Sequence, residues 1–85
     1  MKIKVKNEWN VPNQFVIETE EGTYFQSYDS IIVFVSNKPL DRIQLGKDWA
    51  FSVTTGKYRN KFLNETKKET EAKLRSGEYI LNEKL

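Results

Sequence analysis

The chain has 85 residues with 14 basic and 12 acidic side chains, and its formal net charge of +2 is too small by itself to indicate nucleic-acid binding. This length allows a single domain, residues 1–85, with a small core made of one layer of helix on one sheet. The sequence contains no cysteine and no histidine, which excludes disulfides, thiol nucleophiles, an imidazole general base and the commonest metal ligands.

The first segment, residues 2–6, alternates lysine with Ile3 and Val5, which is typical of a half-exposed edge strand. This alternation lacks the continuous apolar block of a secretory signal peptide. The longest apolar run, Ile31–Val35, is far shorter than the roughly 20 residues that cross a bilayer. We therefore expect a cytoplasmic protein that makes no contact with a membrane.

A β-hairpin and two further strands are predicted next. Residues 14–19 and 23–28 are rich in β-branched and aromatic side chains, and the turn between them contains a glycine. After a tight turn, residues 31–35 are apolar on both faces, which favours a central strand covered on each side. A turn at 37–40 and a short strand at 42–45 follow.

The segment that follows is expected to lead from sheet to helix. Trp49 and Phe51 lie two residues apart, as successive inward side chains of an extended segment would. The hydroxyl side chains of Ser52 and of the pair Thr54–Thr55 are preferred at a helix N-cap. From Tyr58 onward, apolar residues recur at helical spacing, so a helix is predicted to begin near the threonine pair.

The C-terminal region contains either one helix or two. In a single straight helix Tyr58 and Leu74 would lie roughly 160° apart, so one sheet could not bury both. The stretch Thr66–Glu69 has the form of a capping box, which marks a second helix start. We favour a break near Asn64–Glu65 and a second helix capped by Gly77, with one continuous helix as the alternative.

These elements predict an α+β fold. A small antiparallel sheet of about four strands, from the N-terminal half, would pack against one or two C-terminal α-helices, and residues 78–81 would form a last extended segment over the core. The expected interior consists of Val16 or Ile17, Phe25, Ile31, Val33, Val35, Ile43, Leu45, Trp49, Phe51, Tyr58, Phe62 and Leu74.

Charge is distributed unevenly along the chain. Residues 13–37 contain four acidic side chains and no basic one, whereas residues 57–75 contain seven basic and three acidic side chains. Two interpretations follow: the two halves attract each other and are solvated on their outer faces, or the basic half forms a binding face.

Two short motifs connect the hairpin with the helix start: F-x-S-Y at Phe25–Tyr28 and W-x-aromatic-S-x-T-T-x-K-Y-x-x-x-F-L at Trp49–Leu63. Together with the Lys/Glu-rich helix that follows, they resemble a domain of unknown function found in proteins of Firmicutes bacteriophages and other mobile elements. The resemblance spans roughly residues 24–79, although that family often has a polar residue at the place of Ala50 and tyrosine at the place of Phe51. It implies a small accessory protein that acts by binding inside an infected bacterium.

Protein binding is the favoured function. No phosphate-binding loop, metal-ligand cluster or activated nucleophile is present in the sequence, so we expect a non-enzymatic protein without catalytic residues, metal or cofactor. An acidic hairpin could occupy a site built for nucleic acid on a host or defence protein. The candidate residues are Glu18, Glu20, Glu21 and Asp29.

Nucleic-acid binding is the alternative. Tyr24, Phe25 and Tyr28 could stack on unpaired bases while the basic helical region, residues 57–75, contacts phosphates. The candidate phosphate contacts are Lys57, Arg59, Lys61, Lys67 and Lys68. A homodimer formed through the edge strand, residues 2–6, is compatible with either function.

Overall fold

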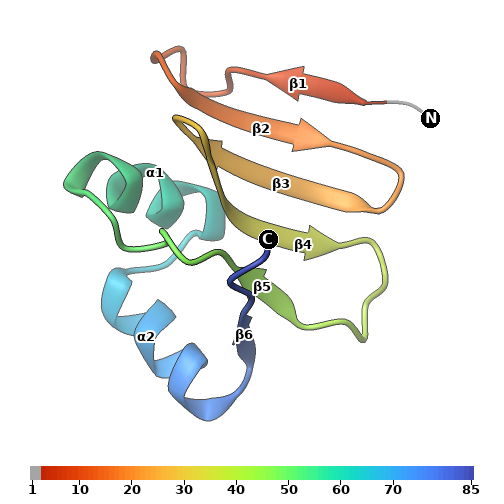
Figure 1. Cartoon of the computed structure of the whole chain (residues 1–85), viewed down its shortest axis with the longest axis vertical. Coiled ribbons are helices and arrows are strands. Elements are labelled where there is room, and N and C mark those ends of the chain that lie inside the picture. Colours follow the sequence, from red (N-terminus) through yellow and green to blue (C-terminus); the bar gives the residue numbers. More distant parts are fainter. Residues whose placement is uncertain (1–2) are drawn as a thin grey trace.

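The computed structural model describes residues 3–85 and has an α+β fold, with one six-stranded sheet and two helices in the C-terminal half (Figure 1). The strands are β1 (Lys4–Lys6), β2 (Gln14–Glu18), β3 (Gly22–Ser27), β4 (Ser30–Ser36), β5 (Ile43–Leu45) and β6 (Tyr79–Leu81), and the helices are α1 (Val53–Leu63) and α2 (Lys67–Ser76). The edge strand predicted over residues 2–6 is described from Ile3 onward, and Lys2 lies outside the described residues.

The predicted fold class is confirmed, but the estimate of about four strands is wrong. The sheet has the order β1-β2-β3-β4-β5-β6, and only the β5–β6 pair is parallel. The last extended segment becomes a strand because the two helices return the chain to the β5 edge, where Ile43 pairs with Tyr79 and Leu45 with Leu81. A parallel neighbour requires a crossover of this kind.

A bulge in β4 decides which side chains enter the core. Phe25 pairs with Val33 but Gln26 pairs with Ile31, so Ile32 is an extra residue in β4. Ile32 and Val33 are therefore both buried, with 1% and 0% of their surface exposed, whereas Ile31 is only half-buried. The expectation that Ile31 belongs to the interior is wrong.

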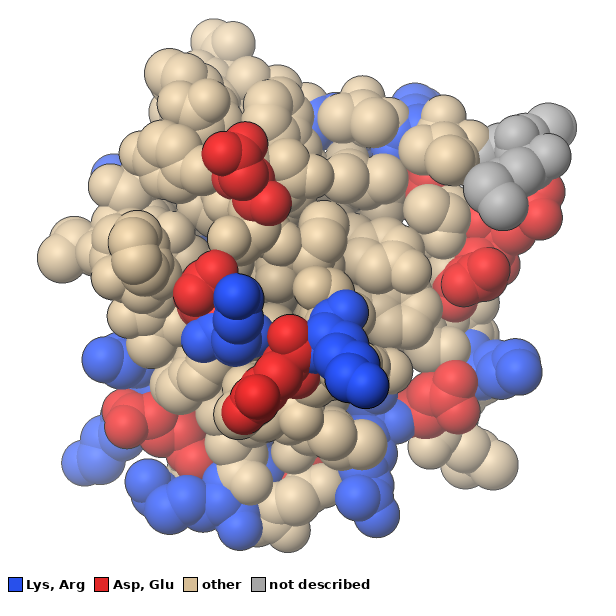
Figure 2. All heavy atoms as spheres, viewed as in Figure 1, with Lys and Arg blue, Asp and Glu red and all other residues tan. Residues whose placement is uncertain are grey.

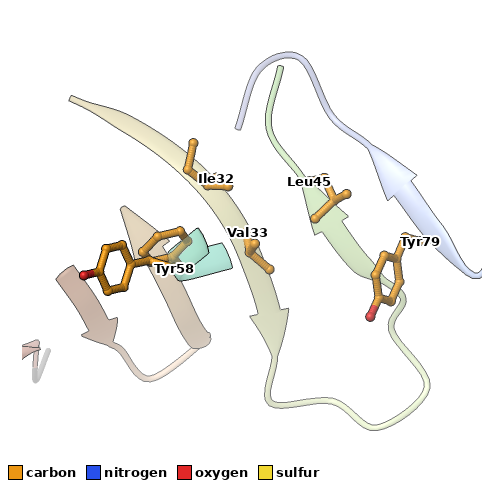
Figure 3. Packing of buried hydrophobic residues seen from close by; sticks show 6 residues of the cluster. Ile32, Val33, Leu45, Tyr58 and Tyr79 are labelled. Atoms are coloured by element: carbon orange, nitrogen blue, oxygen red, sulfur yellow. The ribbon is translucent and has the colours of Figure 1, made fainter. Parts of the chain in front are cut away.

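The buried cluster combines side chains from the strands of the sheet with Tyr58 of α1 (Figure 3). It consists of Phe25, Ile32, Val33, Leu45, Tyr58 and Tyr79. Trp49, Phe62 and Leu74 pack against this cluster as expected. Phe51, in contrast, is 78% exposed, because residues 46–51 form turns in which the Phe51 amide donates to the Asp48 carbonyl at 3.0 Å. The prediction that Phe51 is a core residue is wrong.

The favoured prediction of two helices is confirmed, and the single continuous helix is wrong. Ser52 is the N-cap of α1, since its hydroxyl accepts a hydrogen bond from the Thr55 amide at 3.1 Å. Asn64 ends α1 in the left-handed region, with φ of 55°. Thr66 then begins α2 with both hydrogen bonds of a capping box, and Gly77 ends it with φ of 84°.

The two faces of the sheet differ. One face is covered by α1, where the Ser27 and Thr55 hydroxyls lie 2.9 Å apart and the rings of Phe25 and Phe62 stack at 5.6 Å. Side chains alternate along a strand, so the neighbours of these buried residues point to the other face. There, successive cross-strand partners form an uncharged row over all six strands: Val5, Ile17, Tyr24, Phe34, Gln44 and Ile80.

Candidate protein-binding surface

The four predicted acidic residues do not form one group. Glu20 and Glu21 are exposed in the turn between β2 and β3, and Glu18 precedes them and pairs with Lys6 at 3.2 Å. Asp29 lies in the turn between β3 and β4, at the other end of β3 (Figure 1). Figure 2 shows carboxylates at the right-hand end of the molecule, where the β2–β3 turn lies. The structure therefore brings together Glu20 and Glu21 and separates them from Asp29.

The acidic turn borders the uncharged face of the sheet. Glu20, Glu21 and Tyr24 line a hollow of about 140 Å³, and Glu20, Glu21, Phe34 and Asp41 contribute to a second hollow of about 440 Å³. The rings of Tyr24 and Phe34 stack between them, with centroids 4.4 Å apart. We call these five residues, Glu20, Glu21, Tyr24, Phe34 and Asp41, the hairpin-tip surface.

Hydrogen bonds hold the acidic turn in one conformation. The Thr19 hydroxyl donates to the Gly22 carbonyl at 2.9 Å and accepts from the amides of Glu21 and Gly22 at 3.2 Å. Asn37, in the adjacent β4–β5 loop, donates to the carbonyls of Glu20 and Glu21 at 2.7 and 3.0 Å. A Cβ at Gly22 would collide with the Val35 carbonyl, which explains the glycine there. The turn is thus built as a rigid projection.

Four of the five predicted phosphate contacts are at the surface. Lys57 and Lys61 are exposed on α1, with their ammonium groups 5.5 and 5.7 Å from the Tyr58 ring centroid. Lys67 and Lys68 are exposed in the first turn of α2. These lysines are available to a ligand.

Arg59 is not available, which corrects its assignment as a phosphate contact. Only 1% of its surface is exposed. Its guanidinium donates to the Trp49 carbonyl at 2.6 Å and to the Asn60 side-chain oxygen at 2.9 Å. Burial lowers the pKa of Arg59, and the nearby carboxylates of Glu65 and Glu71 oppose that effect. Arg59 therefore supports the fold.

The aromatic side chains proposed for base stacking lie in three environments. Phe25 is completely buried beneath α1, so its assignment as a base-stacking residue is wrong. Tyr24 points to the sheet face that the helices do not cover, and Tyr28 lies in the β3–β4 turn. The exposed lysines belong to the helices on the opposite face. Tyr24 and these lysines are therefore poorly placed to bind one nucleic-acid strand.

Sequence reasoning missed a buried polar cluster around Glu65. One oxygen of this carboxylate accepts hydrogen bonds from the Lys73 ammonium at 2.7 Å and the Tyr79 hydroxyl at 2.8 Å, and the other accepts from the Thr70 hydroxyl at 2.5 Å. The Glu65 side chain is only 3% exposed. The cluster ties the link between the helices to β6, and we assign it to stability.

Two further observations concern metal ligands and membrane spans. Within residues 3–85, no group of three or more acidic side chains is placed to hold a metal ion. Neither of the two helices described here has the length and apolar character needed to span a bilayer.

The chain was compared with known proteins. A protein family described as "Family of unknown function (DUF8033)" matches residues 2–79. The chain belongs to this family. No curated protein and no solved structure matches it. Membership in DUF8033 brings no assigned chemistry, so a function has to be inferred from the surfaces of the chain.

Proposed function

We propose that this protein is a non-enzymatic binding module that uses the hairpin-tip surface to bind another protein. In this proposal it is a small accessory protein of a bacteriophage or mobile element, and it acts in the bacterial cytoplasm on a host or defence protein. The proposed context comes from the motifs Phe25–Tyr28 and Trp49–Leu63, which resemble a domain found in proteins of such elements. The observation that supports binding is the stacked pair Tyr24–Phe34 bordered by carboxylates.

The surface has the composition of a protein interface. Binding energy in interfaces is concentrated in aromatic side chains near the centre, and polar or charged residues form the rim. Here Tyr24 and Phe34 supply the aromatic centre, and Glu20, Glu21 and Asp41 supply an acidic rim. A partner of complementary chemistry would present an apolar patch surrounded by lysine or arginine, as proteins that bind nucleic acid often do.

The rigidity of the turn favours binding. Immobilising flexible loops on association costs free energy, and a loop that is already ordered avoids that cost. The turn is ordered by the hydrogen bonds of Thr19 and Asn37 described above. Lys38 also lines the larger hollow. Because it would repel a basic group of the partner placed beside it, it restricts the basic groups of the partner to positions near the carboxylates.

The proposal is tested by affinity capture from infected-cell lysate with two variants that carry the same change in net charge. Glu20→Lys/Glu21→Lys reverses the charge of two of the three carboxylates in the acidic rim. Glu78→Lys/Glu83→Lys reverses the charge of two exposed carboxylates elsewhere. A partner that the wild-type chain and the Glu78/Glu83 variant retain, and that the Glu20/Glu21 variant loses, supports the proposal. Titration of that partner should then show at least about tenfold weaker binding for Tyr24→Ala. Equal capture by all three chains would contradict it.

Nucleic-acid binding remains a second candidate function because four lysines, Lys57, Lys61, Lys67 and Lys68, are exposed on the helices. Fluorescence anisotropy with single-stranded and duplex oligonucleotides, at low and moderate salt, separates the two functions. Binding that weakens steeply with salt and disappears when these lysines are reversed would favour this alternative. We expect no binding even at low salt.

A further inference from the structure

A further pocket lies at the opposite end of β3 from the hairpin tip, apart from the two hollows described above. Its volume is about 180 Å³, and it lies between the β3–β4 turn and the start of α1. Its lining includes two aromatic side chains, Tyr28 and Phe51, two carboxylates, Asp29 and Asp48, and the aliphatic side chain of Ile32. None of these residues belongs to the hairpin-tip surface.

The two aromatic side chains that line the pocket are largely exposed to solvent. Phe51 is 78% exposed and Tyr28 is 49% exposed. Tyr28 also has a left-handed backbone, with φ of 54°, in a two-residue turn where glycine or asparagine is usual. Its conformation is maintained by its amide, which donates to the Asn13 carbonyl at 2.7 Å, and by its carbonyl, which accepts from the Gln26 side chain at 2.6 Å. Such strain is often retained at binding sites.

Two carboxylates, those of Asp29 and Asp48, give the lining of the pocket a negative charge. Asp48 is oriented by the Ser30 hydroxyl, which donates to it at 2.9 Å. The carboxylate of Asp29 has no hydrogen-bond or ion-pair partner among residues 3–85, where the ion pairs are Lys6–Glu18 and Lys73–Glu65.

Positive charge near the pocket does not offset the negative charge of Asp29 and Asp48. The N-terminus of α1 contributes roughly half a positive charge, which is less than the two carboxylates together. Lys47 lines a neighbouring hollow with the same two aspartates but pairs with neither of them. The pocket therefore favours a cation over an anion.

We propose that this pocket binds an arginine side chain presented by a partner polypeptide. The guanidinium would enter between Tyr28 and Phe51 and lie beside Asp29 and Asp48, and the methylene stem would lie against the exposed part of the Phe51 ring. Arginine fits better than lysine for two reasons. Its planar guanidinium stacks on aromatic rings such as those of Tyr28 and Phe51, and it can donate to both carboxylates at once.

The test uses three small probes in NMR titrations of the full chain: N-acetylarginine amide, N-acetyllysine amide and N-acetylcitrulline amide, which is neutral and has nearly the shape of the arginine probe. The arginine probe should bind most tightly, with shifts concentrated in residues 27–32 and 48–55. Asp29→Asn/Asp48→Asn should weaken it about tenfold and Phe51→Ala about threefold. Glu78→Gln/Glu83→Gln, which removes two exposed carboxylates outside the pocket and outside the hairpin-tip surface, should leave it unaffected.

Several results would overturn this assignment: binding of citrulline as tight as that of arginine, tighter binding of lysine, shifts that occur only outside the pocket, or unchanged affinity in the Asp29/Asp48 variant. The amide spectrum of each variant shows whether it has folded. Because the pocket and the hairpin-tip surface share no residue, failure here leaves the proposed function of that surface standing, and the reverse is also true.

Discussion

The guanidinium of Arg59 donates to the main-chain carbonyl of Trp49 at 2.6 Å and lies over the Trp49 ring, 5.1 Å from its centroid. One side chain thus ties the turns before α1 to the body of the helix. Lys57 and Lys61, two residues away on either side, remain exposed. Within one motif, Arg59 therefore stabilises the fold, whereas Lys57 and Lys61 remain at the surface.

Arg59→Lys should destabilise the fold although it conserves the charge. A lysine cannot reproduce the planar group that bonds Trp49 and Asn60 together, and loss of charged hydrogen bonds in a buried site costs about 2 kcal/mol. Urea unfolding at pH 7 measures this. Lys61→Ala, the exposed control, should change the free energy of unfolding by less than about 0.5 kcal/mol. Equal effects of the two changes would show that Arg59 is not structural.

Stability should depend on pH through the Glu65 cluster. Burial alone would raise the pKa of Glu65, but hydrogen bonds from Lys73, Thr70 and Tyr79 outweigh it and hold this pKa below its usual value of 4.5. The cluster therefore contributes fully above about pH 4.5, and its contribution is lost as the pH falls through the lower folded-state pKa.

At alkaline pH the contribution of this cluster to stability decreases as the pH rises. The hydrogen bond to Glu65 raises the pKa of Lys73, and burial, reinforced by the hydrogen bond to Glu65, raises the pKa of Tyr79 to about 12. Lys73 and Tyr79 each stabilise the folded state fully below their usual pKa, which is near 10. This stabilisation is lost as the pH rises through their raised folded-state pKa values. Stability should therefore have a plateau between about pH 5 and pH 10.

Glu65→Gln tests this pH dependence in unfolding titrations from acid to alkaline pH. It should lower the plateau by about 2 kcal/mol and flatten the acid limb, since the variant has no carboxylate to protonate at this site. Glu83→Gln, an exposed control, should leave the curve unchanged. An acid limb that persists in Glu65→Gln would assign the pH dependence to other groups.

The β4 bulge predicts a contrast between adjacent isoleucines. Ile32→Ala should cost about 3 kcal/mol, because it leaves a cavity in the core, whereas Ile31→Ala should cost clearly less. Thermal or urea unfolding of the two variants gives the comparison directly. A larger loss for Ile31→Ala would mean that β4 alternates without the bulge.

Two glycines should respond to alanine in opposite directions. A Cβ at Gly46 would collide with the Ile31 carbonyl, so Gly46→Ala should destabilise the fold by about 2 kcal/mol. At Gly56, in the first turns of α1, the nearest atom would be 3.7 Å away, and Gly56→Ala should stabilise it by about 0.5 to 1 kcal/mol. The difference in melting temperature between the variants measures both effects, and two shifts of the same sign would contradict this prediction.

Prediction from sequence worked best where the signal was local. The capping box at Thr66–Glu69 and the glycine at the end of α2 were identified because their hydrogen bonds connect residues a few positions apart. It failed for Phe51, whose spacing from Trp49 looked like that of a strand while the chain forms turns there. Spacing of two residues over a single pair is weak evidence, because turns also place alternate side chains on one side.

The candidate sites were predicted less well than the fold. Glu20 and Glu21 are predicted as part of an acidic set with Glu18 and Asp29, but their association with Phe34 and Asp41 depends on how β4 returns beside the hairpin. The separation of Asp29 from them follows from the length of β3. Asp48 has no signal in the sequence, since nothing local shows that it lines the same pocket as Asp29.

The order of residues alone was enough to indicate the hairpin, the capping box of the second helix and the absence of thiol and imidazole chemistry, because each depends on composition or on neighbours along the chain. Three properties were decided by the folded chain: the bulge that buries Ile32, the burial of Arg59, and the assignment of Tyr24 and the helix lysines to opposite faces. The physical reason is common to all three. Each depends on strand register and on packing between distant segments, and many registers satisfy the same apolar pattern when a strand such as Ile31–Val35 is apolar on both sides.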